Sequence, residues 1–274
     1  MNAVHPRSVL QAAGGREVFL KVHQCIWSGR FHGNTLESIE ECLAEGVARA
    51  EIDVMMLPER DWLVLSHEFT LGMRDQLSFR APTLREVVEL LTRIAAPTLI
   101  ELDMMDVDPI PIARLQELVE VTRPVRERVV FNNVGDWNLR RLLAIEPALR
   151  MGFDPAGYLD VEDSELPVGA YGYRDAHPLA KARYASPSEY LFDRMGGILR
   201  LVPSCEEIHL RLSAFERMVE DGFAVADFVH QRGMKLDVWT LDAGTPNWQP
   251  RLHRAVAAGV DMVTTNTAAE LAQA

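Results

Sequence analysis

Two pairs of acidic residues, each inside an otherwise apolar segment, are the residues of this sequence best suited to chemistry. Glu51 and Asp53 interrupt the segment "AEIDVMML", and Glu101 and Asp103 interrupt "TLIELDMM". Residues two apart on a β-strand point to the same side, so each pair would place two anions together among apolar neighbours. Such burial is costly without a cation or hydrogen-bond donors. Gathered at one place, these carboxylates would form an oxygen-rich site for a hard divalent cation, Mg²⁺ or Ca²⁺, rather than for zinc.

Two histidines close neighbouring apolar segments and could move protons beside such a cation. His23 ends "EVFLKVH", and His67 lies near the end of "WLVLSHE". Imidazole can accept or donate a proton near neutral pH. Each feature alone also has a purely structural interpretation. The histidines could be core residues with satisfied hydrogen bonds, one carboxylate pair could be bound by arginines, and the other could lie at a solvated strand end. The convergence of all of them on one site is what favours catalysis.

The elements that must position these residues alternate between strand and helix. Apolar runs of strand length alternate with segments of helical periodicity, and Thr83 and Glu86 fit a capping box at the start of one helix. The predicted strands cover 17–23, 50–57, 62–68, 98–105, 128–134, 149–154, 206–212, 235–241 and 261–266. The predicted helices cover 34–46, 83–95, 111–123, 136–147, 214–231, 250–258, 267–273 and the segment "SPSEYLFDRMGGIL".

This alternation predicts parallel βαβ units in an α/β protein. Roughly eight strands in a chain of this length favour a TIM (β/α)₈ barrel over a doubly wound sheet. No glycine-rich phosphate loop follows a strand, which argues against nucleotide binding, and residues 1–274 are predicted to form a single domain. The chemistry of such barrels lies at the C-terminal ends of the strands, where His209, Arg211 and Trp239 also fall.

Composition limits the partners. The formal net charge of −12 argues against a nucleic acid or an anionic membrane surface as the main partner. The cysteines, Cys25, Cys42 and Cys205, are odd in number and lack CxxC spacing, which favours a reducing compartment over a disulfide framework. The opening segment lacks the apolar region of a signal peptide, and no later run reaches membrane-spanning length. We therefore expect a soluble, cytoplasmic protein that acts on a small molecule.

Several of these motifs occur together in a known family. The series "VHQC…HGNTLESIEECLAEGVARAEIDVMM…DWLVLSHE" resembles the opening of glycerophosphodiester phosphodiesterases, which read H-R-G, P-E-N-T, a helix, an E-x-D strand and a strand ending in H-D. The likeness continues in "TLIELDM", "VVFNNVGDWNLRRLLAIEP", "LDVWTLD" and "GVDMVTTNTAAEL". It covers residues 19–154 and 206–270. Each motif is weak alone, but their order and spacing are specific.

The resemblance implies a TIM barrel of the phospholipase-C-like phosphodiesterase type that hydrolyses phosphodiesters with a divalent metal. By position in the motifs, it assigns general acid and base roles to His23 and His67 and a place near the substrate to Trp239. The carboxylates that match the metal ligands of the family are Glu51, Asp53 and Glu101. The chemistry agrees, because a phosphodiester is anionic and needs positive charge on its oxygens together with proton transfer at the attacking and leaving groups.

Three positions depart from the family pattern. Gln24 stands in place of an arginine, Gly33 in place of the glutamate of P-E-N-T, and Asp103 in place of a lysine that contacts phosphate. Losing two cations should weaken phosphate binding unless Arg30 or Arg211 supplies the missing charge. Asp103 could instead become a further metal ligand. The short interval "FTLGMRDQLSFRAP" also predicts that the usual small cap insertion is lacking.

The favoured function is metal-dependent cleavage of a phosphodiester, either to hydrolysed products or through a cyclic phosphate. A glycerophosphodiester, a sugar-phosphate diester and a lysophospholipid all fit the altered pocket. Two alternatives stay open. One is a metal-dependent TIM-barrel isomerase or aldolase with the same carboxylates, and the other is a non-catalytic relative that binds a phosphorylated ligand.

Overall fold

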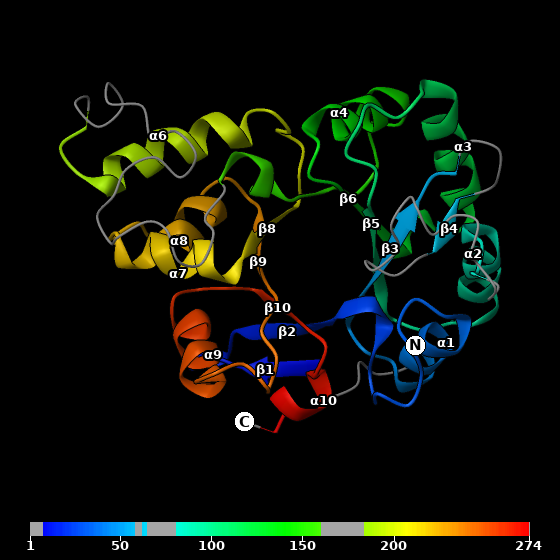
Figure 1. The fold of residues 1–274 in the computed structure, drawn as a ribbon, viewed down its shortest axis with the longest axis horizontal. Coiled ribbons are helices and arrows are strands. Elements are labelled where there is room, and N and C mark those ends of the chain that lie inside the picture. Colours follow the sequence, from blue (N-terminus) through cyan, green and yellow to red (C-terminus); the bar gives the residue numbers. More distant parts are fainter. Residues whose placement is uncertain (1–7, 58–61, 65–80, 160–183, 274) are drawn as a thin grey trace.

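A computed structural model describes residues 8–57, 62–64, 81–159 and 184–273, and Figure 1 shows its strands surrounded by helices. The strands are β1 (Val9–Gln11), β2 (Glu17–Val22), β3 (Arg49–Met55), β4 (Leu63–Val64), β5 (Leu99–Met104), β6 (Val129–Asn132), β7 (Gly152–Phe153), β8 (Glu207–Arg211), β9 (Lys235–Trp239) and β10 (Met262–Thr265).

The described strands form the predicted barrel. The sheet order β6-β5-β3-β2-β10-β9-β8-β7 runs through eight strands, and every neighbouring pair in it is parallel. A parallel bridge between Phe131 and Met151 joins the two ends of this order, β6 and β7, so the ring is nearly closed. The α/β TIM-barrel fold class is confirmed.

Helices connect the strands and cover the barrel from outside. They are α1 (Leu36–Glu45), α2 (Leu84–Arg93), α3 (Ile112–Thr122), α4 (Asp136–Ile145), α6 (Pro187–Leu199), α7 (Leu212–Glu220), α8 (Val225–His230), α9 (Trp248–Ala257) and α10 (Ala268–Leu271). Helices α1 to α4 lie on one side of the strands in Figure 1, and α6 to α9 lie on the other. Thr83 and Glu86 form the predicted capping box of α2.

Alternation along the strands separates the apolar core from the barrel interior. On β2, Val18, Leu20 and Val22 are fully buried in the apolar cluster, whereas Lys21 lines a cavity inside the barrel. The same alternation places the polar side chains of several strands in the interior, where they meet one another.

Two predicted elements differ from the structure. The helix expected over 214–231 is two helices, α7 and α8, because the chain turns at Gly222, whose φ of 79° is open to glycine and strained for other residues. The predicted strand 62–68 contributes β4, which pairs antiparallel with β3 outside the barrel ring, and its remaining residues lie outside the described part. The interval expected to lack a cap insertion also lies there, except for its last residues. No described helix is both long and apolar enough to cross a membrane.

Candidate active site

Strand register brings the polar side chains of the barrel together. Glu51 of β3 pairs with Glu101 of β5, and Asp53 pairs with Asp103 one pleat further along. On the opposite side of the ring, His209 of β8 pairs with Asp237 of β9. Parallel strands in register therefore place these groups in layers within the barrel.

Glu51, Asp53 and Asp103 form a group whose carboxylate oxygens lie within 4.8 Å of one another. Burial raises the pKa of Glu51 well above its usual range, and the neighbouring Asp53 raises it further. Burial and the nearby Glu101 likewise raise the pKa of Asp103. The group thus holds more negative charge than its surroundings neutralise.

Neutral donors orient two of these carboxylates. The backbone N–H of Gln24 donates to Glu51 Oε2 at 2.8 Å, and its side-chain Nε2 donates to Asp53 Oδ2 at 2.9 Å. Asn34 Nδ2 donates to the same Asp53 oxygen at 2.7 Å. A Cβ at Gly33 would lie 2.7 Å from the Cβ of Gln24, so the glycine leaves room for the glutamine. Both departures, Gln24 and Gly33, thus belong to one arrangement that supports the carboxylates.

Glu101 has a different partner. Its Oε2 lies 2.5 Å from Lys21 Nζ, which also lies 2.7 Å from Asp237 Oδ2 and 3.0 Å from His209 Nδ1. The two carboxylates raise the pKa of Lys21 in spite of burial, which acts in the opposite direction, so the lysine is a fixed cation. The pKa of Asp237 falls to about 2: burial opposes the shift, and Lys21 and His209 outweigh it.

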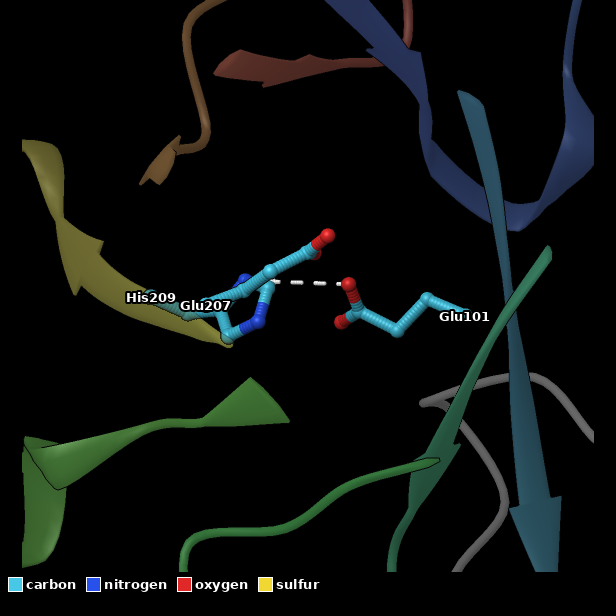
Figure 2. A group of neighbouring side chains, drawn as sticks. All are labelled: Glu101, Glu207 and His209. Carbon is cyan, nitrogen blue, oxygen red and sulfur yellow. Dashed lines mark ion pairs between the residues drawn. The ribbon is translucent and has the colours of Figure 1, made fainter. Parts of the chain in front are cut away.

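A second group of possible metal ligands joins Glu101 of β5 to Glu207 and His209 of β8 (Figure 2). The dashed line in Figure 2 joins His209 Nδ1 to Glu101 Oε2, at 3.6 Å. Glu207 is already ion-paired with Arg49 at 2.8 Å, and Lys21 occupies the space beside Glu101. Protein cations therefore neutralise this second group, and it is less suited to a metal than the first.

His23 is held in one orientation by a relay of hydrogen bonds. Its Nδ1 lies 2.7 Å from Asn266 Oδ1, and Asn266 Nδ2 donates to Asp242 Oδ2 at 2.9 Å. A carboxylate accepts only, so Asn266 must present its oxygen to His23, and His23 Nδ1 must carry the proton. In the neutral imidazole, Nε2 is then the unprotonated atom, and it lies 3.8 Å from Glu51 Oε2.

A cavity of about 370 Å³ contains most of these groups. Its lining includes His23, Glu51, Glu101, Asp103 and Trp239. Apolar wall is supplied by Met104, Met105, Val107 and Val134. At the rim, the guanidinium of Arg211 lies 5.2 Å from the ring centroid of Trp239, a cation–π contact. The cavity thus combines several carboxylates with the imidazole of His23, and the exposed cation of Arg211 lies beside its Trp239.

Five of the predicted site residues line the cavity, and Asp53 and Gln24 adjoin them through the contacts given above. His67 is outside the described residues. Arg30 lies on an exposed loop, with its guanidinium 5.0 Å from the ring centroid of Phe31. The structure therefore brings together His23, Glu51, Asp53, Glu101, Asp103, Gln24 and Trp239, with Arg211 at the rim.

Sequence reasoning missed several polar residues of the site. Lys21 and Asp237 precede His23 and Trp239 by two residues, so strand alternation alone could have placed them on the same interior face. Asn266 directly follows the last strand, where barrel chemistry is expected. Asp242 could not be found this way, because its role depends on a loop that folds back to Asn266.

The first carboxylate group fits a divalent cation. Among the described residues, buried Glu51 Oε1 has no hydrogen-bond partner, and no lysine or arginine forms an ion pair with Glu51 or Asp103. Carboxylate oxygens gathered in this way are the ligands that Mg²⁺ and Ca²⁺ prefer. In the part of the chain that the structure describes, Glu51 and Asp103 therefore offer negative charge that a dication would balance.

No protein-family model matches the sequence, and no curated protein matches it. Among solved structures, a glycerophosphodiester phosphodiesterase from Parabacteroides distasonis has a TM-score of 0.60 at 13% identity, covering 93% of this chain and 94% of that chain. The enzyme of the same description from Thermotoga maritima gives 0.57 at 16% identity, over 93% and 97%. A phosphodiesterase from Oleispira antarctica, in complex with the product sn-glycerol-3-phosphate, gives 0.58 at 16% identity, over 93% and 95%. At these identities the comparisons establish a shared fold and confirm the resemblance at that level.

Proposed function

We propose that this protein is a divalent-metal-dependent phosphodiesterase. The observation that supports this most directly is the position of His23 Nε2, 3.8 Å from a carboxylate of the acidic group, within one cavity. A phosphodiester resists attack because it is anionic, so its cleavage needs concentrated positive charge and a positioned base. The fold shared with phosphodiesterase structures agrees with this chemistry.

The metal ligands in this proposal are Glu51, Asp53 and Asp103. Glu101, predicted as a ligand from the motifs, lines the same cavity and has one oxygen bound to Lys21, so it would contribute through its other oxygen. Asp103 is then a ligand as well as a residue beside the substrate. The bound Mg²⁺ or Ca²⁺ supplies the positive charge that the phosphate oxygens require.

His23 acts as the general base in this mechanism. Its unprotonated Nε2 takes the proton of the attacking hydroxyl, while Asn266 holds the opposite ring nitrogen. His67 is the predicted general acid that protonates the leaving alkoxide. When the attacking hydroxyl belongs to the substrate, the products are a cyclic phosphate and the free alcohol, and water can open the cyclic phosphate in a second step.

The substrate is a small phosphodiester: a glycerophosphodiester, a sugar-phosphate diester or a lysophospholipid. Trp239, whose buried Nε1 has no hydrogen-bond partner among the described residues, offers a donor in the cavity, and Arg211 offers a cation at its rim. Arg211 would replace the charge that is absent at positions 24 and 103. The free cysteines, all buried, agree with a reducing compartment and thus with a cytoplasmic location.

An activity screen tests this proposal. The protein would be incubated with a panel of phosphodiesters in the presence of Mg²⁺, Ca²⁺ or a chelator, and products would be followed by phosphorus NMR. We expect alcohol release with a divalent ion, none with chelator, and at least about a 100-fold loss for His23→Ala. Equal rates for the wild type and His23→Ala would leave only ligand binding, and carbonyl chemistry without alcohol release would favour the isomerase or aldolase alternative.

A further inference from the structure

His209 and Asn132 carry two buried polar atoms of the cavity that the proposed mechanism does not use. His209 is 1% exposed and Asn132 is 3% exposed, and both line the cavity. His209 Nε2 and Asn132 Oδ1 have no hydrogen-bond partner among the described residues. Leaving buried polar atoms unpaired costs free energy, so two of them side by side indicate a site for a ligand.

His209 Nε2 is a hydrogen-bond donor. Lys21 Nζ lies 3.0 Å from His209 Nδ1, and its other two acceptors are Glu101 and Asp237. If Lys21 donates its third proton to Nδ1, the single ring proton must sit on Nε2. If the ring is doubly protonated and Nδ1 donates to Asp237 at 3.0 Å, Nε2 again carries a proton. The remaining form, a neutral ring protonated only at Nδ1, would leave the third proton of Lys21 without an acceptor.

Asn132 Oδ1 is an acceptor in a fixed position. Asn132 Nδ2 donates to Asp103 Oδ1 at 3.1 Å. Because a carboxylate only accepts, the amide must point its nitrogen, and not its oxygen, toward Asp103. A Cβ at Gly152 would lie 2.3 Å from His209 Nε2 and 3.4 Å from Asn132 Oδ1. The missing side chain of Gly152 therefore makes room for the imidazole next to the amide oxygen.

We propose that His209 and Asn132 bind a hydroxyl group of the substrate's alcohol moiety. A hydroxyl accepts from an N–H and donates to a carbonyl at the same time, which matches this pair. An anion would be repelled by Asn132 Oδ1 and the adjacent Asp103, and a cation would be repelled by the N–H of His209. The inference rests on the proposed function and narrows it to diesters whose alcohol carries a free hydroxyl, because a site built to bond a hydroxyl discriminates against analogues that lack it.

The test compares two phosphates that differ only in hydroxyl groups. Binding of sn-glycerol-3-phosphate and of propyl phosphate would be measured by calorimetry with Mg²⁺, for wild type, His209→Phe, His209→Gln and Gly152→Ala. We expect wild type to prefer glycerol phosphate about tenfold or more. The preference should disappear in His209→Phe and Gly152→Ala and should be largely kept in His209→Gln, whose amide N–H reaches a similar position. Retained binding of propyl phosphate shows that each variant is folded.

Equal binding of both phosphates by wild type would mean that the pair holds a buried water only, and would overturn the inference. A preference that survives in His209→Phe and Gly152→Ala, or no binding of either phosphate, would overturn it too. The proposed function is scored separately, by wild-type alcohol release from the panel of phosphodiesters described above, with a divalent ion and with chelator. Turnover without a hydroxyl preference rejects only the inference, and a hydroxyl preference without turnover rejects only the proposed function.

Discussion

His23 is hydrogen-bonded through Nδ1 to Oδ1 of Asn266, at 2.7 Å, and this contact fixes the tautomer of the histidine. The amide of Asn266 is itself oriented by Asp242, which accepts from both its side chain and its backbone N–H, at 2.9 and 2.7 Å. The carboxylate of Asp242, which reaches the imidazole only through Asn266, thus determines which ring nitrogen of His23 carries the proton.

A substitution at Asp242 should invert the tautomer of His23, and a second substitution at Asn266 should restore it. In Asp242→Asn, the new amide donates to Asn266, which must turn and present its N–H to His23 Nδ1, so the proton moves to Nε2. We expect kcat to fall about 100-fold or more, because the base is then protonated. In the double variant Asp242→Asn/Asn266→Asp, the acceptor returns and most activity should return with it. Nitrogen-15 NMR of the histidine ring reports the tautomer directly; an unchanged His23 spectrum in Asp242→Asn would contradict the relay.

The apo-protein should lose stability as the pH rises through the range of its buried carboxyls. Burial raises the pKa of Asp154 to about 6, and Glu51 and Asp103 shift in the same direction. The folded state then holds protons that the unfolded state releases above about pH 4, so stability falls between pH 4 and 6, by about 2–3 kcal/mol for Asp154. Asp154→Asn should flatten this dependence in urea unfolding curves measured at several pH values. A wild-type profile parallel to that of the variant would exclude the Asp154 contribution.

A divalent ion should oppose that loss, because it binds the ionised carboxylates of the folded state. The rise in melting temperature on adding Mg²⁺ or Ca²⁺ should therefore be larger at pH 7.5 than at pH 5. Differential scanning calorimetry with and without chelator measures both values. A metal-induced shift that is equal at the two pH values, or larger at pH 5, would contradict the assignment of the raised pKa values to the metal-binding group.

Lys21 is expected to be essential for stability. It is 3% exposed and neutralises Glu101 and Asp237, so Lys21→Met would leave two buried carboxylates without their cation. We expect a loss of about 3–5 kcal/mol in the free energy of unfolding. The control is Arg93→Met, which breaks an exposed ion pair with Glu40 and should cost less than about 1 kcal/mol. Similar losses for the two variants would show that the buried network contributes no more than a surface pair.

Arg211 should affect substrate binding more than the chemical step. Its guanidinium is exposed and stacks on Trp239 at the rim of the cavity. Arg211→Ala should raise KM about tenfold with little change in kcat, and the effect should shrink at high salt. Arg30→Ala, on an exposed loop, is the matched control and should leave both constants near those of wild type. The reverse result would assign the phosphate cation to Arg30.

The barrel could be predicted from the sequence because its signal is repeated. Apolar runs of strand length alternate with segments of helical periodicity, and some helices have a recognisable start, such as the capping box at Thr83. One error falls where a single signal spans two elements. The helix predicted over 214–231 is an example, since its apolar periodicity continues across the turn at Gly222. Propensity along the chain does not show where a helix stops and a new one begins in a different direction.

The site was only partly predictable from the sequence. The spacing of residues along a strand indicates which side chains share a face, but it does not indicate which side chains of other strands they contact. The prediction that Glu51 and Asp53 share a face agrees with their grouping in the structure. Glu101 and Asp103, also two apart, meet different neighbours: Lys21 lies beside the first, and Asn132 lies beside the second. Those partners come from strands distant in sequence, and strand register alone decides which pairs form.

The central claim is that Glu51, Asp53 and Asp103 together bind a catalytic divalent cation, and calorimetric titration with Mg²⁺ and Ca²⁺ tests it most directly. We predict one site per chain in wild type, and loss of that site in both Glu51→Gln and Asp103→Asn, each of which keeps the shape of its side chain. Glu40→Gln, on the surface, should bind as wild type does. Absence of binding in wild type, or unchanged binding in Glu51→Gln and Asp103→Asn, would contradict the metal-dependent mechanism.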